Sequence, residues 1–218
     1  TIALPAGLTA TYVADSNLTQ GTFTITVPAG VNGAGAFTIN GPMDSSGNVM
    51  QQFDGTLRAT ANLVADNGFE SGALTAWSPT VTNTASAPAA VLTPTYAGTY
   101  AVRLGNGTGT TIQGGISQIT QLMTVPALST SVTVTIRYQT FTNFQATLHD
   151  YGSCQLLTSA GGLIGTVIND YINYTTWQTA SGTYSVAGGS QIRLTCFSSQ
   201  DGSHISGMYL DEITVIAN

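Results

Sequence analysis

The sequence predicts an all-β protein. Nearly every segment alternates between apolar and polar residues, and none shows the apolar stripe of an amphipathic helix. Turn-forming clusters such as GNGTGT and VAGGSQ separate the alternating segments at the short spacings typical of a β-sandwich. These two patterns together predict the fold class.

The first part of the chain contains only short alternating segments. They read LTATYVA, GTFTITV, GAFTIN and VMQQFDGTLRATA, and PAGVNGAG and GPMDSSGN separate them. The segments that follow are longer, and no linker rich in Pro, Ser and Thr lies between the two parts. We therefore expect a small β domain or arm over residues 1–62 and a full-sized β-sandwich over residues 63–218.

The longer segments alternate most regularly. SVTVTIRYQTF places Val132, Val134 and Ile136 on one face, and Arg137 and Gln139 on the other. GTYAVRL and SQIRLTCF alternate in the same way. This pattern predicts antiparallel strands with one face buried and one face in water.

Charged residues are rare, at 6% of the chain against about a quarter in an average protein, and none is a lysine. Apolar residues make up 42%, which is enough to form a core, so disorder is not expected. The net charge of −6 and the four scattered arginines argue against a nucleic-acid partner. No apolar run of about 18 residues is present, so we expect no membrane partner.

The two cysteines, Cys154 and Cys196, leave two interpretations open. A zinc site shared with His149 and His204 lacks the usual ligand spacing. The cysteines could form a disulfide if their strands are neighbours. They could equally be two buried thiols, since unpaired cysteine behaves as a small hydrophobe.

The segment NGFESG (67–72), followed by Trp77, resembles the start of the jelly-roll carbohydrate-binding modules of cellulases and xylanases. Further similar segments follow in the same order: AGTYAVRLGNG, ISQITQLMTVP, VTVTIRYQTF, TTWQTASGTYSV and MYLDEITV. The resemblance covers residues 63–218. It implies a jelly-roll β-sandwich there, preceded by the small N-terminal β part.

The resemblance also implies a structural calcium ion. The family commonly holds Ca²⁺ with the glutamate of the opening motif and the aspartate before the last strand, which correspond to Glu70 and Asp211. Two such carboxylates would tie the first and last strands of the domain together. The alternation slips between Leu210 and Ile213, as at a β-bulge that turns Asp211 aside. Alternatively, both carboxylates cap backbone N–H groups or pair with an arginine.

Strand alternation also predicts a glycan platform. Sugars stack on aromatic rings, and their hydroxyls bind planar polar side chains. If their strands are neighbours, six residues would line a concave sheet: Arg137, Gln139, Phe141, His149, Tyr151 and Arg193. The alternative is that the arginines have no glycan-binding role and bind water, backbone or a neighbouring subunit. Trp77 and Trp177 are expected in the core instead, as large aromatics usually are.

No catalytic pattern emerges. Asp150 and Asp170 lack a partner carboxylate at recognisable spacing. GSHISG is not a G-x-S-x-G elbow, and GNGTGT lacks the lysine and helix of a phosphate loop. We therefore predict that the chain is not an enzyme.

Two functional hypotheses follow. The first is a structural protein on the surface of a bacteriophage virion, a head decoration or fibre protein. Residues 1–62 would attach it to a capsid or other virion protein, and the jelly roll would face outward to bind glycans. Its uncharged strand edges predict a homo-oligomer. The alternative is a secreted bacterial carbohydrate-binding module that binds plant or cell-wall polysaccharide outside the cell.

Overall fold

The computed structural model describes five N-terminal strands, spanning residues 2–3, 9–14, 21–26, 33–39 and 53–59, and most of residues 62–218. Within 62–218, the residues outside the description are 83–85, 108–111, 113, 128, 144–149 and 171–173. The described residues form strands and turns, and no helix among them could cross a membrane. The all-β prediction is confirmed.

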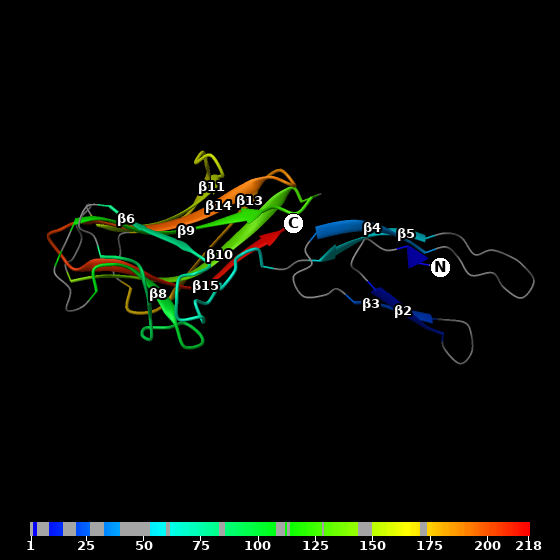
Figure 1. The fold of residues 1–218 in the computed structure, drawn as a ribbon, viewed down its shortest axis with the longest axis horizontal. Helices are drawn as coiled ribbons and strands as arrows, with labels where there is room; N and C mark the ends of the chain where they lie inside the picture. The colour runs from blue at the N-terminus through cyan, green and yellow to red at the C-terminus, as the bar shows by residue number, and fades with distance from the viewer. Residues whose placement is uncertain are drawn as a thin grey trace, which may run out of the picture.

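The N-terminal strands form two small sheets of their own (Figure 1). Their bounds are β1 (Ile2–Ala3), β2 (Thr9–Ala14), β3 (Gly21–Thr26), β4 (Gly33–Ile39) and β5 (Phe53–Ala59). One sheet has the order β1-β4-β5, and β2 pairs with β3. The division of the chain into a unit over 1–62 and one over 63–218 stays a prediction.

The remaining strands form a sandwich of two five-stranded antiparallel sheets (Figure 1). The β10 sheet has the order β13-β10-β15-β8-β7. Its strands are β7 (Ala89–Val91), β8 (Ala101–Gly105), β10 (Ser131–Thr142), β13 (Gln178–Ser185) and β15 (Ser206–Ala217). The β14 sheet has the order β12-β11-β14-β9-β6. Its strands are β6 (Ser78–Val81), β9 (Gly114–Thr124), β11 (Tyr151–Thr158), β12 (Leu163–Asp170) and β14 (Gln191–Asp201). Most connections cross from one sheet to the other, as in a jelly roll.

The core lies between the two sheets, where alternate residues of each strand meet. Val132, Val134 and Ile136 of β10 are fully buried, as their alternation predicts. Each large apolar side chain buried in this way contributes about 1.5 to 3 kcal/mol. The opening segment adds Phe69 and Trp77, whose rings stack with centroids 5.5 Å apart. Trp77 is only 4% exposed, so its expected place in the core is confirmed.

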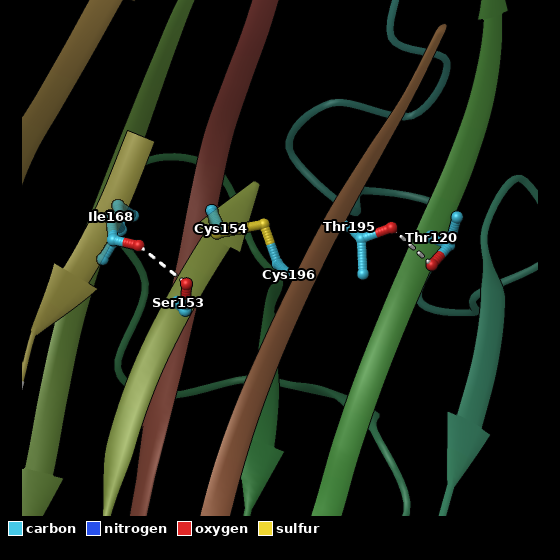
Figure 2. The surroundings of a disulfide bond; sticks show 6 residues. All are labelled: Thr120, Ser153, Cys154, Ile168, Thr195 and Cys196. Atoms are coloured by element: carbon cyan, nitrogen blue, oxygen red, sulfur yellow. Dashed lines mark hydrogen bonds between the residues drawn. A yellow bond between two sulfur atoms is a disulfide. The ribbon is translucent and has the colours of Figure 1, made fainter. Parts of the chain in front are cut away.

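A disulfide joins the two cysteines inside the core (Figure 2). Cys154 of β11 lies directly opposite Cys196 of β14, and both are fully buried. The structure therefore selects the disulfide over the pair of free thiols. Figure 2 also shows a second cross-strand pair in the same sheet, between the hydroxyls of Thr120 and Thr195, 3.1 Å apart.

The start of the sandwich is held to the last strand by Asn62. Its Oδ1 accepts hydrogen bonds from the backbone N–H groups of Val64 (3.1 Å) and Val215 (2.8 Å). Its Nδ2 donates to the carbonyl of Ile213 at 2.9 Å. The opening motif is thus fixed beside β15, where the family resemblance predicts the two ends of the domain to meet.

Candidate functional site

The structure does not bring the six predicted platform residues onto one surface. Arg137, Gln139 and Phe141 lie on β10, whose neighbours are β13 and β15. Tyr151 and Arg193 lie on β11 and β14 in the opposite sheet. The condition that all of these strands are neighbours is not met, because β11 and β14 pair with each other but not with β10, and the outer faces of the two sheets point away from each other. His149 lies outside the described residues.

The outer face of the β10 sheet gathers aromatic rings around Arg137. We call it the aromatic face and define it by five residues: Tyr96, Arg137, Phe141, Trp177 and Tyr209. The Arg137 guanidinium carbon lies 4.5 Å from the centroid of the Tyr96 ring. That ring meets Trp177 edge-on, with centroids 6.1 Å apart. Arg137 also donates a hydrogen bond to the Thr179 hydroxyl, which fixes the guanidinium beneath the tyrosine. A cation–π contact of this kind contributes about 0.5 to 1 kcal/mol at an exposed site.

The other half of the aromatic face is built on β10 and β15. Phe141 and Tyr209 pack with ring centroids 4.7 Å apart. Burial raises the pKa of Tyr209, although the nearby charge of Arg103 lowers it in part. The Tyr209 phenol is therefore protonated at neutral pH and able to donate a hydrogen bond. Gln139, between the two halves, donates to the carbonyl of Tyr174 at 2.9 Å.

Trp177 corrects an expectation from the sequence. It is half-buried on the outer face rather than packed in the core. The alternation of β13 could have placed it there, because Thr179 and Ser181 follow on the same face and both are exposed. No sequence pattern predicts Tyr96 on this face. It lies in the loop before β8, where no periodic pattern reports on the direction of a side chain.

The outer face of the β14 sheet offers fewer rings among the described residues. Tyr151 and Phe197 meet edge-on, with centroids 5.7 Å apart. Thr195 and Ser153 are buried on this face, at 7% and 1% exposure. The Ser153 hydroxyl donates to the carbonyl of Ile168 at 2.9 Å, so it is already used within the sheet (Figure 2).

The two predicted calcium ligands lie against the same loop. The register of β15 against β10 shifts beside Asp211, which confirms the bulge. Asp211 is fully buried, and its Oδ2 accepts the backbone N–H groups of Tyr96 (2.8 Å) and Ala97 (3.1 Å). Its Oδ1 accepts the N–H of Glu212 at 2.8 Å. Glu70 accepts the N–H groups of Thr99 and Tyr100 at 2.9 to 3.0 Å.

A third carboxylate approaches the same point. A Cβ placed on Gly68 would lie 3.0 Å from Glu212 Oε1, 3.6 Å from Asp211 Oδ1 and 3.7 Å from Glu70 Cγ. Burial raises the pKa of Asp211; its three backbone hydrogen bonds lower it, and the charge of Glu70 raises it again. A carboxylate-rich cluster of this kind is the donor set that suits Ca²⁺.

Backbone N–H groups bind the oxygens of Glu70 and Asp211 in this structure, so the capping interpretation is the one observed. The type and charge of the residues fit a calcium ion, which these two carboxylates would hold. The ion would supply positive charge between the opening segment and β15. Because the structure shows only the capping hydrogen bonds, the calcium ion stays a prediction.

Two solved structures with a similar fold define the class of the sandwich. A family 61 carbohydrate-binding module, solved with β-1,4-galactotriose, superposes with a TM-score of 0.55 at 14% identity, over 72% of this chain and 99% of the module. The enzymatically active domain of bacteriophage CBA120 tailspike protein 4 superposes with a TM-score of 0.52 at 12% identity, over 72% of this chain and 21% of that one. No family model and no curated protein matches the sequence. The chain therefore has the jelly-roll fold of carbohydrate-binding modules, as its motifs predict.

Proposed function

We propose that this chain is a non-catalytic glycan-binding protein whose aromatic face is the binding surface. The observation that carries the proposal is the Arg137 guanidinium stacked on Tyr96 beside the half-buried ring of Trp177. A pyranose presents a C–H face that stacks on such rings, and its hydroxyls bind planar polar groups. Gln139 and the Tyr209 hydroxyl supply polar groups on the same face.

The class of glycan ligand follows from the same chemistry. Aromatic rings in both halves of the aromatic face suit an oligosaccharide of several neutral hexoses better than a single charged sugar. The module of family 61 was solved with β-1,4-galactotriose, which makes β-galactan a sensible first probe. Both arginines near the face, Arg137 and Arg103, can donate to ring and hydroxyl oxygens.

We propose further that the chain is a structural protein on the surface of a bacteriophage virion. The tailspike structure supports this through its fold alone. In this proposal residues 1–62 attach the protein to a capsid or other virion protein, and copies of the chain associate as a homo-oligomer. The jelly roll is then presented outward to glycans of the host or its surroundings.

A secreted bacterial carbohydrate-binding module is the alternative. The Cys154–Cys196 disulfide favours an oxidising environment outside the cytosol, which a secreted protein always meets. Labelling of purified bacteriophage virions with an antibody to this chain distinguishes the two hypotheses. The antibody is expected to bind the surface of intact virions. Signal confined to soluble secreted protein would support the alternative instead.

Glycan binding can be tested by calorimetry with β-1,4-galactotriose, after a glycan array has ranked related β-linked oligosaccharides. Trp177→Ala is expected to weaken binding about 30-fold, because truncating a central aromatic anchor costs about 2 kcal/mol. Arg137→Ala should weaken it about tenfold, since it removes both a donor and the support of Tyr96.

Tyr151→Ala provides the matched control, because this ring lies on the opposite sheet. It should leave the dissociation constant unchanged. If Tyr151→Ala abolished binding while Trp177→Ala bound normally, the outer face of the β14 sheet would be the site. An array on which no glycan binds would overturn the glycan proposal altogether.

We also propose the calcium ion between Glu70 and Asp211. At a free concentration 100 times its dissociation constant, a bound ion adds about 2.7 kcal/mol of stability. Returning Ca²⁺ to chelated protein should therefore raise the melting temperature by about 5 to 10 °C. Glu70→Gln should abolish this increase. A melting temperature that does not respond to Ca²⁺ would leave Glu70 and Asp211 as backbone caps only.

A further inference from the structure

Three side chains with metal-binding atoms converge at one end of the sandwich. Asp150 immediately precedes β11, Asp201 ends β14, and His204 lies in the turn that leads to β15. One ligand atom from each lies within 4.8 Å of the other two. The cluster is separate from Glu70 and Asp211, and nothing in the proposed glycan site uses it.

Hydrogen bonds from backbone N–H groups to the two carboxylates hold the cluster together. Asp150 Oδ1 accepts the N–H of Asp201 at 2.7 Å, which binds the start of β11 to the end of β14. Asp201 Oδ1 accepts the N–H of Ser203 at 2.7 Å, and Gly202 turns the chain with a φ of 85°. This tight turn returns His204 toward the two carboxylates. The fold therefore places the buried Asp150, the exposed Asp201 and the partly buried His204 next to one another.

The second oxygen of Asp150 points to a missing ligand. Asp150 is only 8% exposed, and its Oδ2 is buried and accepts no hydrogen bond from any described residue. A buried carboxylate oxygen without a partner is costly, and native structures rarely leave one unsatisfied. A cation bound at this oxygen would remove that cost.

We propose that Asp150, Asp201 and His204 bind a divalent transition-metal ion of the Zn²⁺ type. Two carboxylate oxygens and one imidazole nitrogen are a donor set that Zn²⁺ uses in proteins, with water in the remaining position. Ca²⁺ and Mg²⁺ prefer donor sets made only of oxygen, so the histidine selects against them. The ion would balance the negative charge of the two carboxylates.

The proposed ion would link the β14 sheet to the connection that leads from β14 into β15 of the other sheet. Asp150 directly precedes β11 and Asp201 ends β14, which are both strands of the β14 sheet, whereas His204 lies on the connection into β15 of the β10 sheet. Metal binding to the folded state alone stabilises that state by mass action. The zinc-loaded protein should consequently melt about 5 to 10 °C higher at a free concentration 100 times the dissociation constant.

Calorimetric titration of chelator-treated full chain with ZnCl₂ tests the proposal. Binding of one Zn²⁺ per chain is expected, with CaCl₂ and MgCl₂ at least about tenfold weaker at this site. His204→Ala and Asp201→Asn should each weaken Zn²⁺ binding by about 10- to 100-fold or more. Both residues are at least partly exposed, so these variants are expected to fold.

Asp66→Asn is the control, because this carboxylate lies outside the cluster and binds Ser71 instead. It should bind Zn²⁺ as tightly as the wild type. Absence of saturable Zn²⁺ binding would overturn the proposal. So would Zn²⁺ binding that His204→Ala and Asp201→Asn leave unchanged, even if the wild type bound the ion tightly.

Discussion

Replacing Asp211 with alanine is expected to lower the free energy of unfolding by about 4 kcal/mol. The carboxylate is fully buried and accepts backbone N–H groups from Tyr96, Ala97 and Glu212. Each buried donor that loses its partner costs about 1 to 3 kcal/mol. Urea unfolding followed by far-ultraviolet circular dichroism measures the loss.

Glu212→Gln is the matched control, since it changes the neighbouring carboxylate without removing these acceptors. Its cost should stay below about 1 kcal/mol, as for most partly exposed positions. A loss of less than 1 kcal/mol in Asp211→Ala would contradict the capping role. Equal losses of stability in Asp211→Ala and Glu212→Gln would also contradict the capping role.

The pH dependence of Asp211 distinguishes capping from calcium binding. Burial raises its pKa above the ordinary value of 3.8, so the folded state retains a proton that the unfolded state releases. Stability relative to Asp211→Asn should therefore be greatest below pH 3.8 and fall as pH rises through the folded-state pKa. A bound Ca²⁺ would lower the pKa and reverse this sign, so the measurement is made with and without chelator.

The strands and core follow from local sequence patterns. Alternation identifies which side chains of one strand share a face, and the buried residues of β10 agree with it. It cannot say which strands are neighbours, because pairing depends on contacts between distant segments. The proposed platform failed at this step: Arg137 and Arg193 have the right parity, but they lie on different sheets.

The aromatic face shows a second limit of sequence patterns. Tyr96 reaches Arg137 because Asp211 and Glu70 hold its loop against β15. The motif resemblance singled out these two carboxylates, but not the ring that they position. The predicted core position of Trp177 is wrong because it relies on the size of the side chain, whereas the alternation of β13 places this residue on the exposed face. A loop anchored by distant acceptors is readable only once the fold is known.

The disulfide likewise depends on the pairing of distant segments. The sequence alone does not decide whether Cys154 and Cys196 form a disulfide or remain free thiols, since only the register of β11 against β14 makes them direct partners. Removing the bond by the double substitution to alanine should lower the free energy of unfolding by about 4 kcal/mol. The cysteines are 42 residues apart, and closing a loop of that length restricts the unfolded chain by about this amount. Reduced wild type should lose a similar amount.

The double variant Thr120→Val, Thr195→Val is the control for the double cysteine variant. It tests whether the loss of unfolding free energy in the cysteine variant comes from the covalent bond. These residues form a cross-strand pair in the same sheet, joined by a 3.1 Å hydroxyl contact, and valine keeps their branched shape (Figure 2). Loss of that contact should cost about 1 kcal/mol. A cysteine double variant that lost no more would show that the register of β11 and β14 is held by packing alone. The larger loss, measured by denaturant unfolding of oxidised protein, is expected because only the disulfide restricts the unfolded chain.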